Sequence, residues 1–229
     1  MILEFLAQAA DAAKTGATEG TKSVNYFHIL IIQGGGIGYL LWGLSFVVIG
    51  LAINYFMNIN REKILPEVIR GDIEEMFEAK QYREAIEFTE MEEDFFSYTI
   101  YSALSEAPHG YPAMERAMEE AAEERTSKML RHIEWMNLIG NIGPMLGLLG
   151  TVWGMIGAFF AIVKTGSPEP AMLANDIGVA LVTTLLGLAV SIPAMCIFSI
   201  LKTRIDALTS EAVMVAQTMI STFRPTGKK

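Results

Sequence analysis

Residues 135–163 read WMNLIGNIGPMLGLLGTVWGMIGAFFAIV, and no other stretch constrains the fold of the chain so strongly. The stretch contains no Asp, Glu, Lys, Arg or His, and it exceeds the roughly 20 apolar residues that a helix needs to cross a bilayer. Its glycines recur at steps of three and four residues, which places them on one face of a helix. These are Gly140, Gly143, Gly147, Gly150, Gly154 and Gly157. Because a stripe without side chains lets two backbones approach closely, the pattern predicts a membrane helix packed tightly against another helix.

Two further stretches, 29–60 and 177–201, are also free of charged residues and long enough to cross a membrane. The charged fraction of the whole chain is only 19%, below the value of about 25% that soluble domains carry. The sequence therefore predicts an all-α membrane protein with three transmembrane helices. The third stretch has its own stripe of small residues, namely Ala180, Thr184, Gly187, Ser191 and Ala194. It is the natural packing partner for the glycine stripe.

Basic residues near the ends of the spans predict the orientation. They follow the first span, precede the second and follow the third, so these ends are expected to be cytoplasmic. The predicted organisation is a periplasmic segment 1–28 with a possible amphipathic helix, transmembrane helix 29–60, cytoplasmic helical domain 61–134, transmembrane helix 135–163, periplasmic loop 164–176, transmembrane helix 177–201, and a cytoplasmic helix extension with a basic tail, 202–229.

The 61–134 segment is predicted to be helical. Asp72 is expected to cap one helix, and two more are expected over 81–89 and 94–105. Proline and glycine at 108, 110 and 112 should break the chain, after which one long helix should run from about residue 113 into the second span. The third span should continue to about Phe223, so that the helices of 61–134 pack against these two extensions.

Few polar side chains lie inside the spans, and they are the candidate site. Thr151, Thr183 and Thr184 either bond to a carbonyl one turn back on their own helix or face a pore. Pro144 and Pro193 are expected to bend their helices. No titratable residue lies deep in any span, and Asp176 is at an outer boundary. A proton path needs a titratable carrier in the membrane. Either the chain conducts nothing, or a partner helix brings the acid.

Several function classes receive no support. The net charge of -9 argues against nucleic-acid binding, which needs a basic surface. The sequence has no Ser/His/Asp set, no metal-spaced His or Cys and no phosphate loop after a strand, so no enzyme, metal or cofactor is predicted.

Three segments resemble a known family. Residues 144–156 read PMLGLLGTVWGMI, residues 180–195 read ALVTTLLGLAVSIPAM, and residues 80–104 read KQYREAIEFTEMEEDFFSYTIYSAL. All three closely resemble the MotA/TolQ/ExbB proton-channel family. Three spans, rather than four, resemble the ExbB/TolQ branch more than the flagellar stator branch.

The resemblance implies a ring, expected to be a pentamer, in the inner membrane of a bacterial cell. Two copies of an ExbD-like or TolR-like single-span partner would sit in the pore, each with a membrane Asp that takes the proton. The assembly would use the proton-motive force to drive an envelope process through a TonB-like or TolA-like protein, with membrane lipids around it. Thr151 and Thr184 match the two pore threonines of the family.

The chain departs from the family at one position. The usual run resembles GIAEALxTT, whereas this sequence reads DIGVALVTT, with Val179 where the family has Glu. Asp176 lies one turn away on the same face and could replace that Glu, or it could cap the third span. The departure keeps two alternatives open: a membrane scaffold that conducts nothing, and a flagellar or gliding-type stator subunit.

Overall fold

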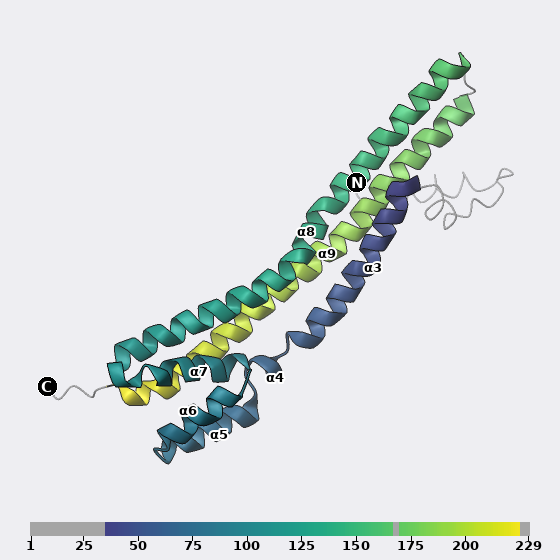
Figure 1. Cartoon of the computed structure of the whole chain (residues 1–229). Helices are drawn as coiled ribbons and strands as arrows, with labels where there is room; N and C mark the ends of the chain where they lie inside the picture. The colour runs from purple at the N-terminus through teal and green to yellow at the C-terminus, as the bar shows by residue number, and fades with distance from the viewer. Residues whose placement is uncertain (1–34, 167–169, 225–229) are drawn as a thin grey trace, which may run out of the picture. The chain divides into compact units, whose positions relative to one another are not determined.

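A computed structural model describes residues 35–166 and 170–224. The N-terminal segment 1–28 with its possible amphipathic helix, the first residues of the 29–60 span and the basic end 225–229 lie outside the described residues. Throughout the described ranges the protein is helical and contains no β-strand (Figure 1). The prediction of an all-α protein is confirmed.

Among the described residues, three helices are long and apolar enough to cross a membrane, as the sequence predicts. They are α3 (Gly35–Asn58), α8 (Tyr111–Thr165) and α9 (Pro170–Ile220). The two long helices are continuous through Pro144 and Pro193. The predicted helix from about residue 113 into the second span is confirmed, and so is the extension of the third span toward Phe223, where the short helix η2 (Ser221–Phe223) ends it.

The connection between α8 and α9 is shorter than the expected loop 164–176. Helix α8 ends at Thr165, and Gly166 follows with a φ of +74° while its N–H donates to the carbonyl of Ile162 at 2.9 Å. This is a glycine C-cap in the left-handed conformation. Helix α9 already begins at Pro170, whose fixed φ suits the first position of a helix. Asp176 is therefore an interior residue of α9, and its interpretation as a cap is wrong.

The chain divides into two compact units, each described here by itself. The first unit contains 35–42 and the described part of 146–187, so it holds the start of α3, the end of α8 and the start of α9. The second contains 43–145 and 188–224, and it holds all the short helices.

The short helices of the second unit are α4 (Arg61–Ile64), α5 (Glu67–Glu78), α6 (Tyr82–Met91), α7 (Phe95–Ser105) and η1 (Ala107–His109). The two helices expected over 81–89 and 94–105 are confirmed, with Asp94 as the N-cap of α7, where its side chain accepts from the N–H of Ser97 at 2.9 Å. The cap predicted at Asp72 is wrong. Helix α5 starts five residues earlier because Pro66 precedes it in an extended conformation and begins the helix there.

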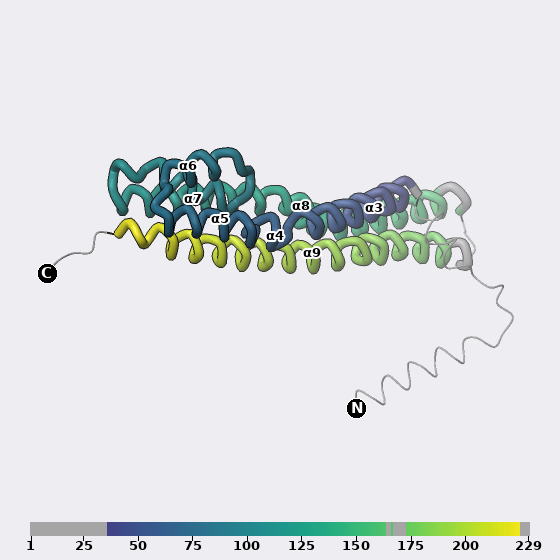
Figure 2. The backbone as a smooth tube through the Cα atoms, turned by 90° about the horizontal axis from the view of Figure 1, so that it is seen from below, coloured from purple at the N-terminus to yellow at the C-terminus, as the bar shows by residue number. Residues whose placement is uncertain are grey.

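The core of the second unit joins the short helices to α8 and α9, as Figure 2 shows for the run of α5, α6 and α7 alongside them. Its largest fully buried side chains include Ile73, Phe96, Ile100, Leu104, Met114, Met118, Ile133 and Ile205. Phe223 packs edge-on against Phe77 and also against Tyr82, which ties the end of α9 to α5 and α6. The expected packing of the 61–134 helices on the two long extensions is confirmed.

Candidate functional site

Glycines of α8 meet the start of α9 within the first unit. A methyl group added at Gly147 would lie 2.9 Å from the Cα of Thr184, and one at Gly154 would lie 2.8 Å from the Cβ of Ala180. At Gly150 the Cβ of Thr183 would be 2.7 Å away. Such distances are shorter than van der Waals contact, so the two helices can lie this close only where α8 lacks side chains.

Two threonine hydroxyls cross the same contact. Thr184 donates to the carbonyl oxygen of Gly147 at 3.1 Å, and Thr183 donates to the same oxygen at 3.2 Å. Thr183 also lies 2.7 Å from the carbonyl of Ala180 on its own helix. A hydroxyl in an apolar setting is costly without a partner, and here both hydroxyls have one on the neighbouring helix.

Thr151 behaves differently. It is only 7% exposed, and its hydroxyl donates to the carbonyl of Leu148 at 2.7 Å, one turn back on α8. The bond leaves the contact between α8 and α9 independent of this hydroxyl. Thr151 thus makes the local bond that was one of the two expected uses. Thr184 bonds to the neighbouring helix instead, which neither expectation included.

The predicted site residues are not all brought together. Nothing lies within 4 Å of a methyl group added at Gly157. Asp176 and Val179 are half-buried and lie about one helical turn apart in α9 of the first unit. Gly143 and Gly187 are buried. Pro144 and Pro193 belong to the second unit, with Gly143.

Much of the apolar surface of α8 in the first unit is not covered by the residues that the structure describes. Trp153 is 72% exposed, and Phe159 and Phe160 are each 63% exposed. Large aromatic side chains in this number are suited to lipid or to another membrane helix rather than to water.

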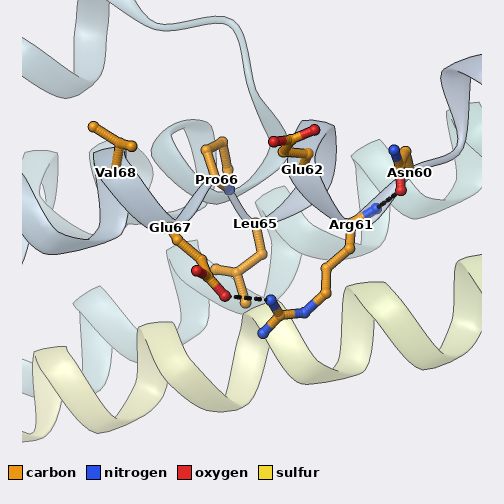
Figure 3. Close-up of a pocket in the computed structure, with 7 residues that line it drawn as sticks. All are labelled: Asn60, Arg61, Glu62, Leu65, Pro66, Glu67 and Val68. Atoms are coloured by element: carbon orange, nitrogen blue, oxygen red, sulfur yellow. Dashed lines mark hydrogen bonds and ion pairs between the residues drawn. The ribbon is translucent and has the colours of Figure 1, made fainter.

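An ion-pair junction that sequence reasoning did not find lies at the start of the short helices. Arg61 contacts Glu67 at 2.6 Å and Glu211 of α9 at 2.8 Å, while Asn60 accepts from its backbone N–H at 2.8 Å. Figure 3 shows Arg61 turned toward Glu67 beside a cavity of about 470 Å³. The hydrogen bond that Arg61 donates to Glu211 is the main cause of the raised Arg61 pKa, and the same bond lowers the pKa of Glu211.

Sequence reasoning used Arg61 only as an orientation signal, because Glu211 is 150 positions away and no local spacing connects the two. Among the residues that the structure describes, no group of three or more His, Cys, Asp and Glu side chains is placed to hold a metal ion.

A model of the family described as the MotA/TolQ/ExbB proton channel family matches residues 87–214. The match runs from within α6 through α8 and most of α9, and it therefore includes every threonine and glycine of the contact described above.

Individual relatives carry related names. A protein named as an ExbB homolog in Methanothermobacter thermautotrophicus is 33% identical over 189 residues, covering 80% of this chain and 66% of that protein. The biopolymer transport protein ExbB of Xanthomonas campestris is 37% identical over 38% of this chain and 34% of its own length. The Tol-Pal system protein TolQ of Haemophilus influenzae is 31% identical over 41% of each. The chain thus spans between a third and two thirds of the length of these relatives.

A solved structure of MotAB from C. jejuni aligns with 97% of this chain and 87% of its own, at 17% identity and a TM-score of 0.49. A likeness at that TM-score decides nothing about the fold.

Proposed function

The chain belongs to the MotA/TolQ/ExbB proton channel family, and from this premise we propose that it is the channel-forming subunit of an ExbB/TolQ-like assembly. The assembly uses the proton-motive force across the inner membrane to energise an envelope process. Relatives of the chain are named ExbB and TolQ, and these names support this class of function.

One observation carries the proposal: the two helices that match the family have no acid, base or histidine deep in the membrane. A proton cannot cross the apolar core without a titratable carrier. The carrier therefore comes from a second protein, an ExbD-like or TolR-like partner with one span and a membrane Asp. A ring of this chain, expected to be a pentamer, surrounds two copies of the partner and passes force to a TonB-like or TolA-like protein.

In this proposal α8 and α9 line the pore, and Thr151 and Thr184 face the Asp of the partner or its water. The assignment requires each hydroxyl to accept a bond from the partner, and a hydroxyl that donates to a carbonyl still has lone pairs for this. Asp176 serves at the pore mouth in place of the Glu that Val179 replaces, and Thr183 holds the helices together.

The orientation belongs to the same proposal. The N-terminus and the connection between α8 and α9 face the periplasm, while α4 to α7 and the C-terminus face the cytoplasm. Arg61 and Lys63 after the first span, Arg125 and Lys128 before the second, and Lys202 after the third support this orientation.

Co-expression with the product of the neighbouring gene, followed by mild detergent purification and native mass determination, tests the proposal. We expect a ring of this chain that holds a minority of partner copies with one membrane Asp. A ring without such a partner, or with a partner that lacks a membrane acid, would refute proton coupling.

One observation favours a second candidate function, a non-conducting scaffold: Val179 stands where the family has Glu. A scaffold that anchors a complex and conducts nothing would tolerate this change. Proton flux into proteoliposomes separates the two, because a scaffold passes no protons whether or not the partner is present.

A further inference from the structure

A second cavity, of about 310 Å³, lies in the second unit between the end of α3, α4, the start of α7 and the middle of α8. Charged side chains of both signs line it, together with the polar end of α3. The main ones are Asn58, Lys63, Glu93, Asp94, Arg125 and Lys128.

Two of the cations have no carboxylate partner within ion-pair distance among the described residues. The ammonium of Lys63 donates to the side chain of Asn58 at 2.8 Å. The guanidinium of Arg125 lies over the ring of Tyr98 at 4.0 Å, and its Nε has no hydrogen-bond partner. The third cation, Lys128, already has one, since it contacts Glu124 at 2.6 Å. The cavity thus offers two positive side chains that form no ion pair with the described residues.

The acids on the same walls are equally uncommitted. One carboxylate oxygen of Asp94 caps α7, but its other oxygen is buried without a hydrogen-bond partner in the described structure. Glu93 is exposed and forms no ion pair with the described residues. Positive and negative groups thus face one cavity without pairing across it, which suits a ligand with a charge of each sign.

The cavity is also at the right depth for a lipid. Asn58 is the last residue of α3 and of its candidate membrane span, so the cavity adjoins the end of that span. The hydroxyl of Tyr55 donates to the backbone carbonyl of His132, another lining residue, which holds α3 and α8 together at this level. Trp135 is 63% exposed near the same level of α8, as is common at the headgroup boundary.

We propose that this cavity binds the headgroup of a zwitterionic phospholipid of the phosphoethanolamine type. The phosphate contacts Lys63 and Arg125, the ammonium contacts the exposed carboxylate of Glu93, and the acyl chains remain in the adjoining leaflet. Arginine and lysine are the usual phosphate ligands in proteins, and basic pockets at the ends of membrane helices hold lipid headgroups. The site does not depend on proton conduction and stands apart from the proposed function.

Binding of short-chain dihexanoyl phosphatidylethanolamine to the full-length detergent-purified protein, measured by native mass spectrometry, tests the proposal. We expect Lys63→Gln and Arg125→Gln each to weaken binding by about tenfold or more, since each removes a charge-assisted contact to phosphate. Arg83→Gln is the matched control, because Arg83 is 93% exposed on α6 and contacts only Glu87. The control should leave the dissociation constant unchanged.

Four ligand comparisons test which charged groups the cavity binds and whether the ligand is a lipid. Dihexanoylglycerol should bind at least tenfold more weakly, because it has no phosphate, and equal binding would refute a headgroup site. Dihexanoyl phosphatidylglycerol binding as tightly would overturn the zwitterionic assignment. Glycerophosphoethanolamine or inorganic phosphate binding as tightly would overturn the lipid source. Lys63 is exposed, so Lys63→Gln retains the fold, and an unchanged affinity in that variant alone would overturn the site.

Discussion

Single glycines decide how the polar atoms of the α8–α9 contact are satisfied. The carbonyl of Gly147 accepts from Thr183 and Thr184 because no side chain at position 147 holds the helices apart. In an apolar medium these hydroxyls have no water as an alternative partner, so close approach and hydrogen bonding depend on each other. One residue thus supplies both the space and the acceptor.

We expect Gly147→Ala to destabilise the protein. The added methyl group would meet the Cα of Thr184 at 2.9 Å and the carbonyl oxygen of Thr183 at 3.0 Å, and neither backbone atom can rotate away. Overpacking of this kind costs about 1–3 kcal/mol. Thermal unfolding in detergent measures the change.

Gly157→Ala is the control for that variant, because it adds the same methyl group to the same helix with nothing within 4 Å. Its melting temperature should match or exceed that of the parent, since alanine favours a helix over glycine. Equal losses in the two variants would mean that the glycines act through helix propensity and not through the contact with α9.

The spacing of the glycines predicted which residues share a face, but it did not identify the partner of each. Gly150 and Gly154 lie against α9, whereas Gly157, one turn further, does not. Where two helices diverge depends on their crossing geometry, and a stripe on one helix does not contain that information. The ion pair of Arg61 with Glu211 was missed for the related reason that no local pattern links distant residues.

At the scale of whole elements, local signals predicted most helix boundaries, and the failures share a cause. Asp94 caps α7, but Asp72 and Asp176 lie inside helices that begin at Glu67 and at Pro170. Aspartate is favoured as an N-cap, yet it is also tolerated within a helix, so its presence does not exclude an earlier start. Proline sets the start in both cases, through Pro66 and Pro170.

The turn between η1 and α8 depends on Gly110. Its φ of +92° and ψ of 170° lie in a region that only glycine occupies readily. We expect Gly110→Ala to cost about 1–3 kcal/mol of stability, because the backbone strain has no relief in an L-residue. Gly71→Ala, inside α5 and with nothing within 4 Å, should instead stabilise by about 0.4–1 kcal/mol.

Denaturant unfolding monitored by circular dichroism tests whether stability falls in Gly110→Ala and rises in Gly71→Ala. A loss of stability in Gly71→Ala as large as in Gly110→Ala would show that the φ angle is not the cause.

The junction of Arg61 with α9 predicts a pH dependence. The hydrogen bond from Arg61 lowers the pKa of Glu211, so the folded protein holds the ionised carboxylate more strongly than the unfolded chain does. Its stabilising effect is fully present above the ordinary Glu pKa of about 4.3 and is lost as the pH falls through the lower folded value.

The difference in melting temperature between the parent and Glu211→Gln should therefore be present at neutral pH and disappear in acid. It should also be small and shrink with salt, because the pair is partly exposed. Glu84→Gln, on an exposed face of α6, is the control and should show no such dependence. A difference that grows toward low pH would contradict the assignment.

At the scale of the whole molecule, the proposed function divides proton conduction between this chain, which forms the channel, and a partner, which brings the acid. Helices α8 and α9 match a proton channel family, yet no Asp, Glu, Lys, Arg or His lies deep in their membrane stretches. Of the two threonines assigned to the proton path, Thr184 also holds α8 against α9, whereas the hydroxyl of Thr151 donates its hydrogen bond to Leu148 within α8. This separation makes a clean functional test possible.

We expect Thr151→Val to abolish or strongly reduce proton flux while leaving assembly unchanged. Valine has nearly the shape of threonine, and the bond it removes runs to Leu148 on the same helix, so the approach of α9 to α8 is not disturbed. Flux into proteoliposomes that contain this chain and its single-span partner is the measurement, with native mass determination on the same samples. Thr151→Ser keeps the hydroxyl and should retain flux. If Thr151→Val conducts like the parent in an intact ring, this threonine does not line the proton path. If Thr151→Ser also conducts nothing in an intact ring, the hydroxyl alone does not support conduction, and the assignment fails.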